Sequence, residues 1–176
     1  NGFLITPSGK KYSSLKVKDI VFVSLEGKYL KKYKPSSEWR FHQDIYIKKR
    51  DAQAIVHTHS TNATALSVHK KPIPAFHYMV ALAGGNDIKC AKYATYGTRE
   101  LSKNILKALN NRKACLIANH GQIAFDSNLP DAFELAQEVE NLSLQYITAL
   151  KLGKPKNLSD KEMNKVLKKA KNYKRD

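Results

Sequence analysis

Two histidines separated by one residue are the feature of this sequence best suited to chemistry. They are His57 and His59, which end the segment Ala54-Ile55-Val56-His57-Thr58-His59. Such a segment predicts a strand, and alternate residues of a strand point to the same face. Two neutral imidazoles on one face can chelate zinc, and a catalytic zinc site takes three protein ligands and keeps one position open. The pair therefore predicts a metal site that needs a third ligand.

His120 is the candidate for that third ligand. It lies in Asn119-His120-Gly121, between two segments that predict strands, residues 114–118 and 122–125. A glycine lets the turn hold its neighbour close to a ligand. The spacing also permits a second interpretation, in which the paired histidines are exposed and bind no metal.

Two short segments could bind a phosphate group. Ser36 and Ser37 precede Glu38 at the predicted start of a helix. Hydroxyls and the free amides of a helix N-terminus suit a phosphate, although the same residues would serve as a plain helix cap. Ser8 and Gly9 stand in a predicted turn that can offer an amide and a hydroxyl to an anion, and that can equally be only a turn.

Strands and helices alternate along the rest of the chain. Strands are predicted at residues 3–6, 20–24, 28–30, 54–59, 114–118 and 122–125. Helices are predicted at residues 38–50, 61–67, 78–83, 98–110 and 129–151, and a last one opens at Ser159. Strands with interspersed helices predict the α/β class, as a three-layer α/β/α domain.

Composition narrows the classes of protein. A chain of 176 residues with 42% apolar and 26% charged residues is a globular domain able to bury a core. No apolar stretch is long enough to span a bilayer, no signal peptide opens the sequence, and Cys90 and Cys115 suggest no disulfide framework. We therefore expect a cytoplasmic protein with no membrane partner.

The net charge of +16 raises the possibility of a nucleic-acid partner. The lysines are spread along the chain, however, and neither an RNA-binding aromatic motif nor a zinc-finger spacing is present. An anionic small substrate explains the charge more simply, and no nucleic-acid partner is expected.

Seven stretches, in order and over nearly the whole chain, resemble the class II aldolase/adducin family. They are LITPSG (4–9), PSSEWRFH (35–42), VHTH (56–59), IPAFHYM (73–79), AGGN (83–86), YATYGTREL (93–101), and NRKA (111–114) with the His120-Gly121 pair. The resemblance implies one such domain over residues 1–176, with a central, mainly antiparallel sheet. It also implies that a family segment with a phosphate-binding Gly-Asn pair is missing before Asn1.

The resemblance assigns roles to the residues of the metal and catalytic site. It implies one Zn²⁺ per chain on His57, His59 and His120. It implies Glu38 as the acid/base group and Tyr78 as the proton donor to the aldehyde half of the substrate.

The substrate pockets follow from the same resemblance. Ser8, Gly9, Ser36 and Ser37 would bind the phosphate. Tyr96 and Tyr173 would wall the aldehyde pocket, in part across a subunit boundary of a homotetramer with sites at its interfaces. Position 96 is Tyr where the family often has Phe, which would make the pocket more polar.

The implied activity is reversible cleavage of a ketose 1-phosphate, of the L-fuculose 1-phosphate type, to dihydroxyacetone phosphate and an aldehyde. One alternative is a pentulose 5-phosphate 4-epimerase, whose motif resembles this one with Asp at the position of Glu38. A methylthioribulose-phosphate aldolase or dehydratase is another. A non-catalytic adducin-like binding module is a third, against which the three histidines and Glu38 argue.

Overall fold

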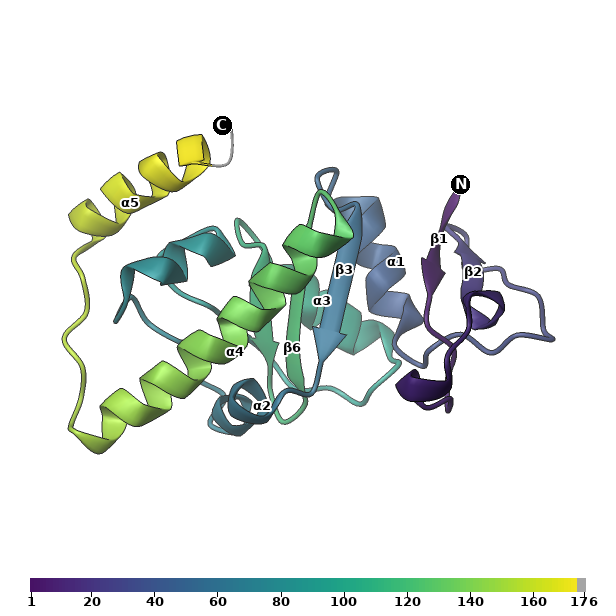
Figure 1. The fold of residues 1–176 in the computed structure, drawn as a ribbon, viewed down its shortest axis with the longest axis horizontal. Coiled ribbons are helices and arrows are strands. Elements are labelled where there is room, and N and C mark those ends of the chain that lie inside the picture. Colours follow the sequence, from purple (N-terminus) through teal and green to yellow (C-terminus); the bar gives the residue numbers. More distant parts are fainter. Residues whose placement is uncertain (174–176) are drawn as a thin grey trace. The chain divides into compact units, whose positions relative to one another are not determined.

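The structure is a computed structural model that describes residues 1–173. The chain forms two compact units, one from residues 1–50 and 94–106 and the other from the remainder. Figure 1 shows the elements in chain order. Each unit is described by itself, and the organisation as one domain over residues 1–176 stays a prediction.

The first unit contains a two-stranded antiparallel sheet. Its strands are β1 (Gly2–Ile5) and β2 (Val21–Ser24), joined through the short 3-10 helices η1 (Tyr12–Ser14) and η2 (Val17–Asp19). Alternate side chains of both strands face inward and form a small core. This core consists of Phe3, Ile5, Val21 and Val23, with Leu25, Trp39 and Tyr46 packed against it.

Two helices complete the first unit. Helix α1 (Trp39–Lys48) buries Phe41 and Ile45, and α3 (Arg99–Ala108) begins in this unit.

The prediction of a strand at residues 28–30 is wrong. Lys28, Tyr29 and Leu30 are all exposed, so no face of this segment is buried as a sheet would require. Gly27, with a φ of 78°, instead turns the chain into a loop.

A four-stranded sheet forms the centre of the second unit, in the order β3-β6-β5-β4. Its strands are β3 (Ala54–Thr58), β4 (Cys90–Ala91), β5 (Ala114–Ile117) and β6 (Gly121–Asp126). β3 and β5 both pair antiparallel with β6, and only β4 pairs parallel. This confirms the α/β class with a mainly antiparallel sheet. The two-residue strand β4 is too short to leave a pattern in the sequence.

Helices α2 (Thr61–Ser67) and α4 (Leu129–Lys151) pack on this sheet in the second unit. The 3-10 helix η3 (Tyr78–Ala83) contacts α4, and α5 (Asp160–Tyr173) contacts η3. Helix α4 contacts β3 and β6 and runs across them in Figure 1. It begins where the Asn128 side chain accepts a hydrogen bond from the Asp131 amide. Its inner side consists of Ala132, Leu135, Ala136, Val139 and Leu142, all buried.

Residues 61–67 and 129–151 form helices with the predicted bounds. Within the described part of the chain, no helix is both long enough and apolar enough to cross a membrane.

Candidate metal centre and phosphate loops

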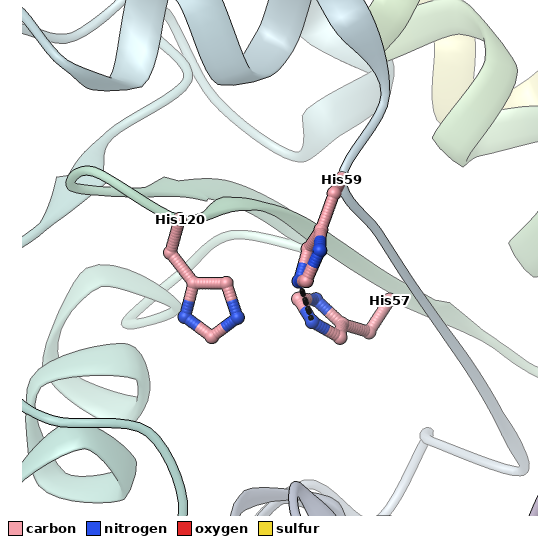
Figure 2. A group of neighbouring side chains, drawn as sticks. All are labelled: His57, His59 and His120. Carbon is pink, nitrogen blue, oxygen red and sulfur yellow. Dashed lines mark hydrogen bonds between the residues drawn. The ribbon is translucent and has the colours of Figure 1, made fainter. Parts of the chain in front are cut away.

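Three histidines of the second unit lie together. His57 is in β3, His59 follows the end of that strand, and His120 is in the turn between β5 and β6. Their potential ligand nitrogens all lie within 4.8 Å of one another. Figure 2 shows the three rings turned toward one another, and their centroids are 4.8 to 5.0 Å apart. The structure thus brings together the three residues predicted to bind metal.

The register of the sheet explains this meeting. Thr58 pairs with Gln122, so His59 comes to lie beside Gly121, and His120 immediately precedes that glycine. A Cβ at position 121 would stand 2.3 Å from the Thr58 carbonyl oxygen and 3.2 Å from the His59 Cα. Only glycine therefore permits so close an approach.

The orientation of His57 is set by a backbone group. Its Nδ1 lies 2.8 Å from the Gln122 carbonyl oxygen. Because a carbonyl only accepts hydrogen bonds, Nδ1 carries the hydrogen and Nε2 keeps its lone pair. A metal-ligating histidine is usually oriented by such a second hydrogen bond. Nothing in the sequence pattern indicated Gln122.

The donor set fits a divalent metal. The Nε2 atoms of His57 and His59 are 3.2 Å apart. Two ligands of a tetrahedral zinc, each about 2.0–2.1 Å from the ion, would be separated by roughly 3.3–3.4 Å. Burial, together with the charge of the neighbouring His59, lowers the pKa of His120. The lowered pKa favours the neutral imidazole, which is the form that binds a metal.

Glu38, in the first unit, is a buried carboxyl at the start of α1. Its residue is 7% exposed, and its Oε2 has no hydrogen-bond partner among residues 1–173. Burial raises the pKa of Glu38 to about 7, although a hydrogen bond from the Gly97 backbone acts in the opposite direction. A carboxyl with a pKa near neutrality can both accept and return a proton.

The two predicted phosphate segments lie side by side within the first unit. The Ser8 amide donates to the Lys34 carbonyl, and the Ser36 amide donates to the Thr6 carbonyl, each over 2.9 Å. Gly9 has a φ of 74°, which a residue with a side chain rarely adopts. The Ser36 hydroxyl accepts a hydrogen bond from the Glu38 amide.

A hollow of about 190 Å³ opens beside Ser8. Three lysines line it, Lys10, Lys32 and Lys34, of which Lys10 forms an ion pair with Asp19. Positive charge beside Ser8 suits an anion.

The structure says less about the roles of the three tyrosines that the sequence analysis assigned to the site. Tyr78 is the first residue of η3, 53% exposed, with its ring 4.8 Å from that of His77. Tyr96 belongs to the first unit and is 67% exposed. The side chain of Tyr173 lies outside the described part of the structure. The roles of all three stay predictions.

Known proteins resemble this chain over most of its length. Residues 1–147 match the family model described as Class II Aldolase and Adducin N-terminal domain. An L-fuculose phosphate aldolase of Escherichia coli O6:H1 is 51% identical over 174 residues, which are 98% of this chain and 81% of the relative. A 5-methylthioribulose-1-phosphate/5-deoxyribulose-1-phosphate aldolase of Rhodospirillum rubrum is also 51% identical, over 98% of this chain and 78% of its own.

A solved structure agrees with these matches. An L-fuculose 1-phosphate aldolase superposes with a TM-score of 0.92 at 43% identity, over 96% of this chain and 79% of that one.

Proposed function

The chain belongs to the class II aldolase and adducin family, and we propose that it cleaves a ketose 1-phosphate reversibly to dihydroxyacetone phosphate and an aldehyde. Its homologues indicate an aldehyde-lyase enzyme acting on a sugar phosphate, of a class that depends on a metal. The observation that carries the proposal is the cluster of His57, His59 and His120.

The proposed substrate class rests on what the relatives share. One relative is named for L-fuculose phosphate and another for 5-methylthioribulose and 5-deoxyribulose 1-phosphates, both at 51% identity. The 1-phosphates named among the relatives have a common phosphorylated end and differ in the remainder of the sugar. Cleavage between C3 and C4 would release the same three-carbon product from each. We therefore propose a ketose 1-phosphate as the substrate class and dihydroxyacetone phosphate as one product. The identity of the aldehyde product is left to experiment.

We assign the metal to the three histidines, with zinc as the proposed ion, because three neutral imidazoles are a common catalytic zinc set. A bound zinc ion would polarise the substrate oxygens and stabilise the negative charge that develops on them. His57 is held for this role by its Nδ1–H hydrogen bond to the Gln122 carbonyl.

Glu38 is the proposed base. In synthesis its carboxylate removes a proton from C3 of dihydroxyacetone phosphate, and in cleavage its carboxylic acid returns that proton. The raised pKa, about 7, lets the same group perform both steps near neutral pH. Tyr78 is proposed to donate a proton to the aldehyde oxygen as the new bond forms, and to accept it back in cleavage.

Binding roles complete the proposal. Ser8, Gly9, Ser36 and Ser37 bind the phosphate, which is supported by the pairing of the two loops that carry them. Tyr96 and Tyr173 wall the aldehyde pocket in a homotetramer, an assignment that rests on the family resemblance.

A substrate panel tests this proposal. The protein is incubated with L-fuculose 1-phosphate, 5-deoxyribulose 1-phosphate and 5-methylthioribulose 1-phosphate, and dihydroxyacetone phosphate is measured by its NADH-linked reduction. We expect release from at least one of them. If none releases it while ribulose 5-phosphate is epimerised, the protein is the epimerase instead.

A further inference from the structure

We propose that Glu140 of α4 is a positioning residue for the metal ligand His59, and that it acts through the first turn of α2. This inference rests on the proposed function in one respect, that the histidine cluster binds a metal. Glu140 lies 81 positions after His59 in the sequence, and no sequence motif singled it out.

The Glu140 carboxylate binds the segment that directly follows His59. Oε1 accepts hydrogen bonds from the Asn62 amide and from Asn62 Nδ2, both over 2.8 Å. Oε2 accepts one from the Ala63 amide over 2.9 Å. Asn62 and Ala63 belong to the first turn of α2, whose amides have no partner within the helix. The segment that follows His59 is therefore hydrogen-bonded to α4 within four residues of that histidine.

The carboxylate is held in its charged form. Burial alone would raise the pKa of Glu140, but hydrogen bonds from the Ala63 and Asn62 amides and from the Ser60 side chain outweigh it, and the pKa is lowered. A charged acceptor makes these hydrogen bonds stronger than neutral ones.

Gln122 of strand β6 also forms a hydrogen bond to the segment that follows His59. Its Nε2 donates to the Ser60 hydroxyl and to the Ala136 carbonyl, each over 2.9 Å. The residue is 1% exposed, and its own carbonyl orients His57. The segment after His59 is thus held by two anchors, one from β6 and one from α4.

Glu140 lies behind the metal-bearing strand rather than among the ligands. Thr58, between the two histidines, projects to the opposite face of the strand. It lines a hollow of about 310 Å³ together with Ser60, Gln122 and Glu140. Glu140 consequently acts on the metal through the backbone at His59, and a small anion in solution could reach its position through this hollow.

A metal-binding measurement tests the proposal. The metal-free wild type and Glu140→Ala compete with a chromophoric chelator for Zn²⁺. Loss of a group that orients a ligand typically weakens metal binding by about 10–100-fold, and we expect a loss in this range. Formate should restore part of the affinity in Glu140→Ala, whereas the same concentration of chloride should not.

Two controls separate positioning from general stability. Val139→Ala removes buried methyl groups from the neighbouring position on α4 and leaves Glu140 in place. Glu134→Ala removes an exposed carboxylate from the same helix. At temperatures chosen to give Val139→Ala and Glu140→Ala the same folded fraction, only Glu140→Ala should bind Zn²⁺ weakly.

The outcomes also separate this proposal from the aldolase assignment, because no substrate is involved. Equal Zn²⁺ affinity in Glu140→Ala and Val139→Ala overturns the positioning role, as does a wild type that binds no Zn²⁺. A wild type that binds Zn²⁺ and loses it in Glu140→Ala, yet cleaves no ketose 1-phosphate, supports the positioning role and refutes the aldolase.

Discussion

The histidine cluster of the second unit and the serine loops of the first are built in different ways. The histidines are placed by a strand, a strand turn and the register of an antiparallel pair, with Gly121 allowing close approach. The serine loops are held by two backbone hydrogen bonds, and Ser37 is exposed. The first arrangement follows from sheet register, whereas the second rests on contacts between two loops. The comparison teaches that the sheet itself places the candidate metal ligands, and that loop contacts place the candidate phosphate-binding residues.

Removing a metal ligand should have the largest effect. His59→Ala leaves two of the three imidazoles, so bound zinc and aldolase activity should both be lost. The loss should exceed the roughly 10–100-fold that removal of an orienting partner costs. Elemental analysis and the dihydroxyacetone phosphate assay measure the two effects. His69→Ala, at an exposed position, should change neither, and normal zinc content in His59→Ala would contradict the assignment.

Removing the proposed base should come second and should spare the metal. Glu38→Gln cannot accept a proton, so turnover should fall by about 10²–10⁴-fold while zinc content stays normal.

The pH dependence of the synthesis rate tests the same residue. The Glu38 carboxylate is the active form in synthesis, and the pKa of Glu38 is raised to about 7, so the wild-type rate should rise with pH up to that region. Glu38→Gln should lack the rise, whereas Glu26→Gln, at an exposed carboxylate, should retain it. An unchanged rise in Glu38→Gln would mean that another group is the base.

Two glycines sharpen the comparison between the units. Gly121→Ala places a methyl group against the Thr58 carbonyl and His59. It should lower the free energy of unfolding by about 1–3 kcal/mol, as overpacking does, and should weaken zinc binding. Gly9→Ala meets no atom within 4 Å but strains a φ of 74°, at a cost of roughly 1–2 kcal/mol. Denaturant unfolding measures the stability of both variants, and zinc competition should show that only Gly121→Ala weakens Zn²⁺ binding. Equal Zn²⁺ affinity in the two variants would contradict this prediction.

The smallest effect is expected at the phosphate loops. Ser37→Ala removes one hydroxyl from an exposed position, so KM for the phosphorylated substrate should rise by about 10-fold. The value of kcat and the zinc content should change little. Steady-state kinetics, with the exposed Ser13→Ala as control, measure this. A fall in kcat without a change in KM would argue against a phosphate-binding role.

The same contrast explains what could be predicted from the sequence. Alternation along a strand places His57 and His59 on one face, and the long apolar stripe of α4 marks its bounds. These are periodic features that local sequence carries. The pairing of the loops at Ser8 and Ser36 has no such period, because it joins segments about 28 residues apart by backbone groups alone.

The contacts that support the candidate metal centre could not be predicted from the sequence for a related reason. Gln122 contacts Ser60 across 62 positions, and Glu140 contacts Asn62 across 78. A glutamine in a strand or a glutamate on a helix has no pattern that reveals such a distant partner. The exposed segment Lys28-Tyr29-Leu30 shows the converse, since a turn sequence with strand-forming residues was not followed by a strand.

Metal-dependent release of dihydroxyacetone phosphate tests the central claim most directly. Metal-free protein is supplied with a ketose 1-phosphate that the panel has identified as a substrate, and zinc is added stepwise. Release should be negligible without zinc, rise in proportion to it, and level off at one ion per chain, and His59→Ala should give none. Full release by the metal-free protein, unchanged by added zinc, would contradict the account.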